Sequence, residues 1–434
     1  MNENRYLMIS GDCHAGPPLP GFRDYFEPRE RDAFDAYCRT RPNIEIANAA
    51  LAGDLDAVGT ALGRFMQATG ASEAASTSFS ERASVMLQGL YDSKTRNQCL
   101  DAEGIVAEVI FPDGFVMNFP PYSDAMEPAA SPVLAKKFWP IEKRLAGARA
   151  YNRWLAEFCN EAPERRAGVI LVPPAHDVGT IVAELRRWRE AGLRGGFLIP
   201  PLAEGLPGYH DPYYDPIWSA AVDLGLPVSV HGGQTQVSDA IQVYGDAEPL
   251  ASVLHFTESP LIERRPITHF IWGGVFERFP KLRLVYAEAL SHWVPQMLHT
   301  LDEMYEMWNL ELLRKNLPLR PSEYWQRNCF ISASFLSRAE AEMRHEIHLP
   351  HMLWGSDFPH PEGTWPYTDV CLRHALHGLP EHEVGLLLGE NALELYDFDR
   401  AKLRTLADEI GPLPADIASP PTERPSDYLG MGLR

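Results

Sequence analysis

The sequence is poor in cysteine and in long apolar runs, and each shortage excludes a class of protein. Only six cysteines occur among the 434 residues, and none forms a Cys-x-x-Cys pair. A disulfide scaffold is therefore excluded for a chain of this length. No apolar stretch approaches the roughly 20 residues of a membrane helix, and Met1–Arg5 lacks an apolar signal core. We expect a soluble protein of the reducing cytoplasm.

Positive charge is also scarce. The chain has 39 lysines and arginines against 59 aspartates and glutamates, which gives a formal net charge of -20. This balance argues against nucleic acid or an anionic membrane as a partner. An anionic small molecule remains compatible with it, because a metal ion or local arginines reverse the field inside a pocket. We expect a small-molecule substrate.

Short apolar runs recur along the chain, with helical patterns between them. The runs are continuously apolar and do not alternate, which is typical of strands that are buried on both faces. There are about eight of them, the number that a closed parallel (β/α)8 barrel requires. The predicted strands are Tyr6–Gly11, Ala107–Phe111, Ala167–Val172, Gly196–Ile199, Pro227–Val230, Leu282–Ala287, Cys329–Ala333 and Met352–Gly355.

The spacing of these runs predicts the domain organisation. We expect one barrel domain over residues 1–410, with a mostly helical insertion at 31–100 after the first strand and an extended tail at 411–434. Among the connecting segments, Asp177–Ala191 has apolar residues at helical spacing, and Trp293–Leu313 is expected to be one long helix. The predicted fold class is α/β, a distorted TIM barrel.

Carboxylates and imidazoles stand where three of these strands end. Asp12 and His14 are two residues apart and share a face of a strand, and oxygen and imidazole ligands together suit Zn²⁺, Mn²⁺ or Fe²⁺. His231 closes the fifth strand and Asp357 follows the eighth. Each has an ordinary alternative: a surface turn for the first pair, a core histidine, and a helix N-cap. Their joint occurrence at three strand ends predicts one metal site.

Two further residues follow the sixth strand. Glu288 stands at its end, where it is a further metal ligand or a general base. His292 lies one helical turn beyond. We interpret it as a proton shuttle or a substrate contact, with a simple helix-start histidine as the alternative.

Three more residues are predicted to contact the substrate. Arg338 follows the seventh strand and either grips a substrate carboxylate or pairs with Glu340 or Glu342. His360 follows the last strand closely and is placed at the rim of the pocket. Trp365 either stacks on a substrate ring or packs as part of a lid.

Five segments between residue 6 and about residue 400 carry a family resemblance. The chain resembles the amidohydrolase superfamily, in the amidohydrolase-related branch that contains the aminocarboxymuconate-semialdehyde decarboxylase-like enzymes. The segments are Ser10–His14, Gly225–Gly233, Gly274–Leu282, Gly355–His360 and Gly389–Ala392.

The resemblance implies a distorted barrel with one divalent metal ion at the C-terminal ends of its strands. It assigns the metal to Asp12, His14, His231 and Asp357, and it implies a homodimer. Binuclear members carry a carbamylated lysine on the fourth strand, and Gly195–Ile199 contains no lysine. We therefore expect a single ion, Zn²⁺ in first place and Mn²⁺ or Fe²⁺ as alternatives.

Two departures from the family pattern decide the predicted reaction. Asp12 stands where many members have histidine or glutamate, and Glu288 stands where decarboxylases of this branch carry a histidine. Glutamate there resembles the hydrolase-like members. We predict hydrolysis of an aromatic or ring-derived acid, amide or ester by a metal-activated water, with Asp357 or Glu288 as the proton carrier.

Two other functions stay open. Metal-dependent non-oxidative decarboxylation of an aromatic or enoic acid is the principal alternative. A barrel that has lost catalysis and serves as a binding protein is the third, and the intact set of metal-ligating residue types argues against it.

Overall fold

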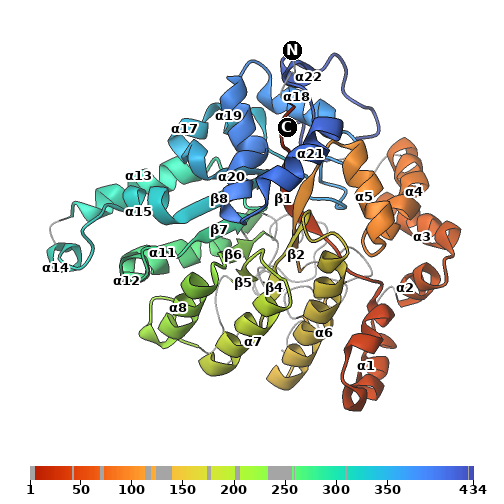
Figure 1. The fold of residues 1–434 in the computed structure, drawn as a ribbon, viewed down its shortest axis with the longest axis horizontal. Coiled ribbons are helices and arrows are strands. Elements are labelled where there is room, and N and C mark those ends of the chain that lie inside the picture. Colours follow the sequence, from red (N-terminus) through yellow and green to blue (C-terminus); the bar gives the residue numbers. More distant parts are fainter. Residues whose placement is uncertain are drawn as a thin grey trace.

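Strands lie at the centre of the molecule and helices surround them (Figure 1). The computed structural model describes residues 5–41, 44–68, 73–112, 119–123, 139–173, 177–200, 206–232, 257–258, 260–307, 310–428 and 430–434. The strands are β1 (Ile9–His14), β2 (Ala107–Phe111), β3 (Arg166–Gly168), β4 (Ile170–Leu171), β5 (Phe197–Leu198), β6 (Val228–His231), β7 (Leu284–Ala287), β8 (Cys329–Ser334) and β9 (Met352–Gly355).

The strands close into a ring. They form two parallel sheets in chain order, β1-β2-β3 and β4 to β9. Only Val169 separates β3 from β4, and its N–H donates to the Ile110 carbonyl at 2.8 Å, so the two pieces act as one barrel strand. At the other edge Cys13 forms a parallel bridge with Phe358. The predicted eight-stranded barrel is confirmed.

The first strand differs from its prediction. We predicted Tyr6–Gly11, whereas β1 is Ile9–His14, so Asp12 and His14 lie within the strand and not after it. The pairing with β2 is irregular between Ser10 and Cys13. The ladder extends this far because the His14 N–H donates to the Phe358 carbonyl at 2.8 Å.

Helices form the outer layer around the strands. The predicted helix at 177–191 is confirmed as α7, and the Asp177 carboxylate caps it by accepting from the Gly179 N–H at 2.9 Å. The outer helices are α6 (Ile141–Asn160), α7 (Val178–Glu190), α8 (Asp215–Leu224), α11 (Arg265–Trp272), α12 (Val275–Arg278), α13 (Val294–Tyr305), α14 (Glu311–Arg314), α15 (Pro321–Asn328), α16 (Arg338–Glu342), α17 (Arg344–Ile347), α18 (Thr368–Leu376), α19 (Glu381–Gly385), α20 (Asn391–Leu395), α21 (Arg400–Ile410) and α22 (Pro414–Ile417).

The prediction of one long helix over residues 293–313 was wrong. Helix α13 ends at Tyr305, and a separate α14 follows. Arg314 donates to the Tyr305 carbonyl at 2.6 Å, and the Tyr305 hydroxyl donates to the Leu317 carbonyl at 2.7 Å. These bonds satisfy the helix end and turn the chain back, which an apolar periodicity does not reveal.

Among the residues that the structure describes, five α-helices lie between the first two barrel strands and form a lobe beside β1 and β2 (Figure 1). A small apolar core of its own holds this lobe together, including Val58 and Leu62 from one helix and Ala83 and Leu87 from the next. The helices are α1 (Arg31–Cys38), α2 (Ile44–Leu51), α3 (Leu55–Ala68), α4 (Glu73–Gln88) and α5 (Ser93–Ala102).

An apolar cluster links the barrel strands to α20 and α21. It includes Ile9, Val109 and Leu353 from the strands, with Leu393 and Leu403 from the two helices. Burying such side chains stabilises the fold by about 1.5–3 kcal/mol each. Polar chemistry is thereby left to the C-terminal ends of the strands, where the sequence places its carboxylates and imidazoles.

All six cysteines are buried and unpaired. Burial raises the pKa of each thiol, for example that of Cys99 to about 11. Among the described residues, no helix combines the length and the apolar character needed to cross a bilayer.

Close packing explains the last of the five family-like segments. A β-carbon at Gly389, in the π-helical turn η6 (Leu386–Glu390), would lie 1.9 Å from the Leu7 carbonyl oxygen. Two residues on, the Asn391 amide donates to the carbonyls of Leu349 and Met352, both at 2.8 Å. The segment thus fixes η6 against the residues that lead into β1 and against β9, the strand that precedes Asp357.

We predict that Gly389→Ala destabilises the protein by at least about 1–3 kcal/mol, because the neighbouring atom is backbone and cannot rotate away. Gly385→Ala is the matched control: it lies four residues earlier, and its β-carbon would be 3.8 Å from Tyr6. Urea unfolding of both variants checks this. Equal stability of Gly389→Ala and the wild type would contradict the packing argument.

Candidate metal centre

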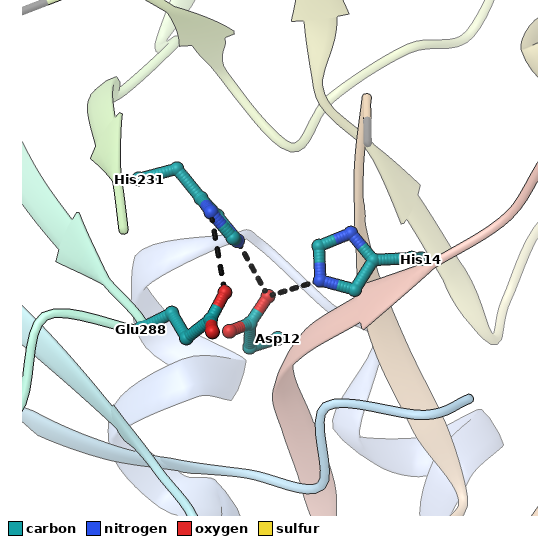
Figure 2. Close-up of side chains that lie close together, drawn as sticks. All are labelled: Asp12, His14, His231 and Glu288. Carbon is teal, nitrogen blue, oxygen red and sulfur yellow. Dashed lines mark hydrogen bonds and ion pairs between the residues drawn. The ribbon is translucent and has the colours of Figure 1, made fainter. Parts of the chain in front are cut away.

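Four side chains from three barrel strands converge at the mouth of the barrel. Asp12 and His14 come from β1, His231 ends β6, and Glu288 follows β7 (Figure 2). The first three are fully buried, and the Glu288 side chain is 18% exposed. One ligand atom of each lies within 4.8 Å of the others.

A second, overlapping group completes the site. His14 and Glu288 belong to it as well, together with Asp357 after β9 and His360 in the following turn, again with ligand atoms within 4.8 Å of one another. His360 was predicted as a substrate contact at the rim, yet the structure places it among potential metal ligands. The sequence feature that could have indicated this is the spacing: His360 is three residues after Asp357. A turn joins the two residues, because the His360 N–H donates to the Asp357 carbonyl at 2.8 Å.

Short contacts connect these six residues, which we call the constellation: Asp12, His14, His231, Glu288, Asp357 and His360. The Nε2 atom of His14 lies 3.0 Å from Asp357 Oδ1 and 3.6 Å from Asp12 Oδ1. His231 Nε2 lies 3.1 Å from the same Asp12 oxygen, and His360 Nδ1 lies 3.1 Å from Asp357 Oδ1. Asp12 and Asp357 therefore each sit between two imidazoles.

The backbone fixes the tautomer of His231. Its Nδ1 is 2.8 Å from the Gly232 carbonyl oxygen, which only accepts, so Nδ1 carries the proton. In the neutral ring Nε2 then has no proton and carries a lone pair. This lone pair faces Oδ1 of Asp12, 3.1 Å away. Two acceptors that face each other at this distance need a cation or a proton between them.

The charge of the site also fits a cation. The six side chains comprise three carboxylates and three imidazoles, with no lysine or arginine among them. Among the described residues, the imidazole nitrogens of His14 and His360 are close to Asp357 Oδ1, but neither oxygen of this buried carboxylate accepts a well-aligned hydrogen bond. Burial, followed by the Asp357 carboxylate, raises the pKa of Glu288 well above its usual value. A divalent ion held by this mixed oxygen and nitrogen set would relieve the repulsion.

Two of the carboxylates are on residues with a strained backbone conformation. Glu288 has φ 49° and Asp357 has φ 56°, in the left-handed region that non-glycine residues seldom occupy. Such residues cost about 1–3 kcal/mol each and cluster at functional sites. The Asp357 N–H donates to the Asp12 carbonyl at 2.9 Å, so the strained turn is tied directly to β1.

Hydrogen bonds from the surroundings hold these groups in place. The Ser334 hydroxyl on β8 donates to Asp12 Oδ2. Buried Glu340 accepts from the Ser291 N–H at 2.6 Å and from the Ser337 N–H at 3.0 Å, which joins the turn that follows Glu288 to the turn that follows β8. Such partners fix the orientation of ligands.

The segment 411–434, predicted to be extended, contains α22 and then lies along the loop that follows β9. Tyr428 donates to the Gly363 carbonyl at 3.0 Å, and the Met431 N–H donates to the Glu362 carbonyl at 2.7 Å. Arg434 donates to Glu340 at 2.6 Å. Although burial opposes it, this guanidinium holds the pKa of Glu340 below its usual value.

Three predicted residues do not join the constellation. His292 is exposed. Arg338 donates to Glu342 at 2.8 Å and to the His377 carbonyl at 2.6 Å, one of the two pairings expected for it. Trp365 packs edge-on against Phe358, with ring centroids 5.6 Å apart. Their roles in catalysis and substrate binding stay predictions.

Comparisons with known proteins agree with this architecture. A family model described as amidohydrolase matches residues 112–398, more than half of the chain. A search of curated proteins found no match. Among solved structures, the chain is similar to an amidohydrolase from Mycobacterium avium subsp. paratuberculosis, with 21% identity, a TM-score of 0.64, and coverage of 90% of this chain and 99% of that one.

Two decarboxylases with bound manganese share the fold. The 5-carboxyvanillate decarboxylase of Novosphingobium aromaticivorans, with bound 3-methoxy-4-hydroxy-5-nitrobenzoic acid, has 19% identity, a TM-score of 0.59, and coverage of 92% of this chain and 99% of that one. A dihydroxybenzoic acid decarboxylase of a Polaromonas species, with bound 2-nitroresorcinol, has 19% identity, a TM-score of 0.55, and coverage of 74% and 91%. These likenesses support the barrel.

We predict that His231→Ala loses most of its bound metal, because the variant lacks one imidazole of the constellation and leaves Asp12 with one fewer partner. The exposed histidine variant His292→Ala is the matched control and should keep its metal. Elemental analysis after loading with Mn²⁺ or Zn²⁺ and gel filtration measures both. Full metal occupancy in His231→Ala would contradict the assignment.

Proposed function

The chain belongs to the amidohydrolase family, and from this premise we propose that it is a metal-dependent enzyme that releases CO₂ from an aromatic or enoic acid. The sequence motifs favoured hydrolysis, but the similar solved structures support the alternative, decarboxylation, better. The observation that carries the proposal is the constellation of three carboxylates and three imidazoles at the barrel mouth, in a chain similar in fold to decarboxylases of ring acids.

Four side chains would hold the metal: Asp12, His14, His231 and Asp357. When bound, a divalent ion supplies positive charge that holds the substrate carboxylate and a neighbouring oxygen. Mixed oxygen and imidazole donors suit Mn²⁺ as well as Zn²⁺. The manganese in the two decarboxylases adds weight to Mn²⁺ relative to the Zn²⁺ that the sequence placed first.

Glu288 is positioned to move the proton. It is the one partly exposed carboxylate of the three, at 18%, while Asp12 and Asp357 are fully buried. In the proposed step the bond between the ring carbon and the carboxylate breaks, and its electron pair stays on the ring carbon. That carbon takes the Glu288 proton as CO₂ leaves, and solvent reprotonates Glu288 at its exposed edge.

Phe111 and His360 would shape the substrate side of the pocket. The Phe111 ring lies 4.8 Å from the His231 ring, and the His360 ring stacks on His14 with centroids 4.1 Å apart. An aromatic acid is compatible with flat rings beside two of the imidazoles that would hold the metal.

Hydrolysis remains the second candidate because of the same glutamate. A carboxylate at Glu288, 3.5 Å from His231 Nδ1, is equally suited to take a proton from a nucleophilic water. The family to which the chain belongs is described as amidohydrolase, and the similar Mycobacterium protein is an amidohydrolase.

We predict that the Mn²⁺-loaded enzyme, given a panel of hydroxybenzoic acids and their amides, releases CO₂ from an acid and leaves one solvent hydrogen on the product ring. The reaction in D₂O is followed by mass spectrometry and by CO₂ detection. In H₂¹⁸O, a product carboxylate labelled from an amide would instead decide for hydrolysis.

We further predict that Glu288→Gln lowers kcat by about 100- to 10,000-fold, the usual contribution of a positioned acid, while metal occupancy is kept. Asp357→Asn serves as the comparison, because loss of a ligand lowers occupancy itself. Parallel measurement of kcat and metal content separates the two roles. Loss of metal in Glu288→Gln would reassign this residue as a ligand.

A further inference from the structure

A fully buried arginine outside the metal constellation contacts β1 and the segment that follows β9, which together carry four of its six residues. Arg96 lies on α5 of the helical lobe, and its side chain has no exposed surface. Its Nη1 donates to the His14 carbonyl at 2.7 Å, and its guanidinium lies 5.0 Å from the centre of the Phe358 ring. His14 is itself in the constellation, and Phe358 follows Asp357.

The rest of this guanidinium is anchored to the barrel. Its Nε donates to both oxygens of Glu108 on β2, at 2.8 and 3.0 Å, and Nη1 also donates to the Gly89 carbonyl at 3.2 Å. Glu108 is likewise fully buried. Arg96 therefore reaches β1 and the residue after Asp357 from a rigid, fully bonded position.

The contacted peptide is the one that aims His14. The His14 N–H is fixed by the Phe358 carbonyl at 2.8 Å, and its C=O is fixed by Arg96 at 2.7 Å. Both backbone groups of this residue are thus fixed where the strand ends. The imidazole between them points at Asp357, with Nε2 and Oδ1 3.0 Å apart.

We propose that Arg96 is a positioning residue for the metal centre, which sets the mutual placement of His14 and Asp357 through the His14 carbonyl and the Phe358 ring. This inference requires the metal site but not the reaction proposed above. It assigns to the helical lobe a function in metal binding.

A second arginine provides a matched control. Arg166 on β3 is also buried, and its Nε lies 3.6 Å from the same Glu108 carboxylate. Its guanidinium donates to the Phe158 carbonyl, the Ser93 carbonyl and Asn97, and it lies 4.0 Å from the centre of the Phe158 ring. None of the hydrogen bonds or ion pairs described for it involves β1 or the loop after β9. Loss of Arg166 therefore weakens the same buried ion cluster without touching the metal ligands.

The test compares Mn²⁺ affinity in the full chain. We expect Arg96→Met to bind Mn²⁺ about 10- to 100-fold more weakly, the range for groups that orient metal ligands, and Arg166→Met to remain within about threefold of the wild type. The Mn²⁺ electron paramagnetic resonance spectrum should change in Arg96→Met alone. Wild-type affinity in Arg96→Met, or an equal loss in Arg166→Met, overturns the proposal.

A triple variant protects the test against simple unfolding. Arg96 and Arg166 share the Glu108 carboxylate, so Arg96→Met, Glu108→Gln and Arg166→Met together remove the buried ion cluster as a unit, which proteins often tolerate. The triple variant should unfold close to the wild-type urea midpoint and still bind Mn²⁺ at least 10-fold more weakly. Wild-type affinity in a folded triple variant overturns the proposal. A wild-type chain that binds no Mn²⁺ overturns the metal centre itself.

Discussion

The seam between the first and last barrel strands is the constraint on which the rest depends. Two backbone hydrogen bonds, from Asp357 to Asp12 and from His14 to Phe358, join residues more than 340 positions apart. They close the ring and also set the separation of the groups that face each other across it. Closure of the barrel and assembly of the candidate metal site therefore depend on the same contacts, and a change that opens the seam separates His14 from Asp357.

The site concentrates charge that the fold cannot neutralise with its own cations. Asp12 and Asp357 lie buried among imidazoles, while the buried Arg96 and Arg166 are engaged with Glu108 on β2. This segregation leaves the mouth negative and ready for a divalent ion. A divalent ion bound there would supply local positive charge and so make the proposed anionic substrate compatible with an acidic chain.

Much of this arrangement could be predicted from the sequence. Continuous apolar runs gave eight strands, and residues at their ends gave Asp12, His14, His231, Glu288 and Asp357, because parallel strands present their C-terminal ends on one face. The prediction failed where distant contacts decide the outcome. The His14–Phe358 bond extended β1, Arg314 helped to end α13 early, and proximity to His14 drew His360 into the constellation. Arg96 carried no local signal, since its partners lie in four separate segments.

The burial of every cysteine has a practical consequence. The thiols lie on α1 and α5 of the lobe, on α6 and α18 of the outer layer, and on β1 and β8 of the barrel. In the folded molecule we expect the thiols not to react with alkylating reagents, because they are buried and their raised pKa values keep them protonated. The rate at which each thiol is modified then reports how often the region around it unfolds. The six natural cysteines therefore measure local unfolding at six positions without any engineered label.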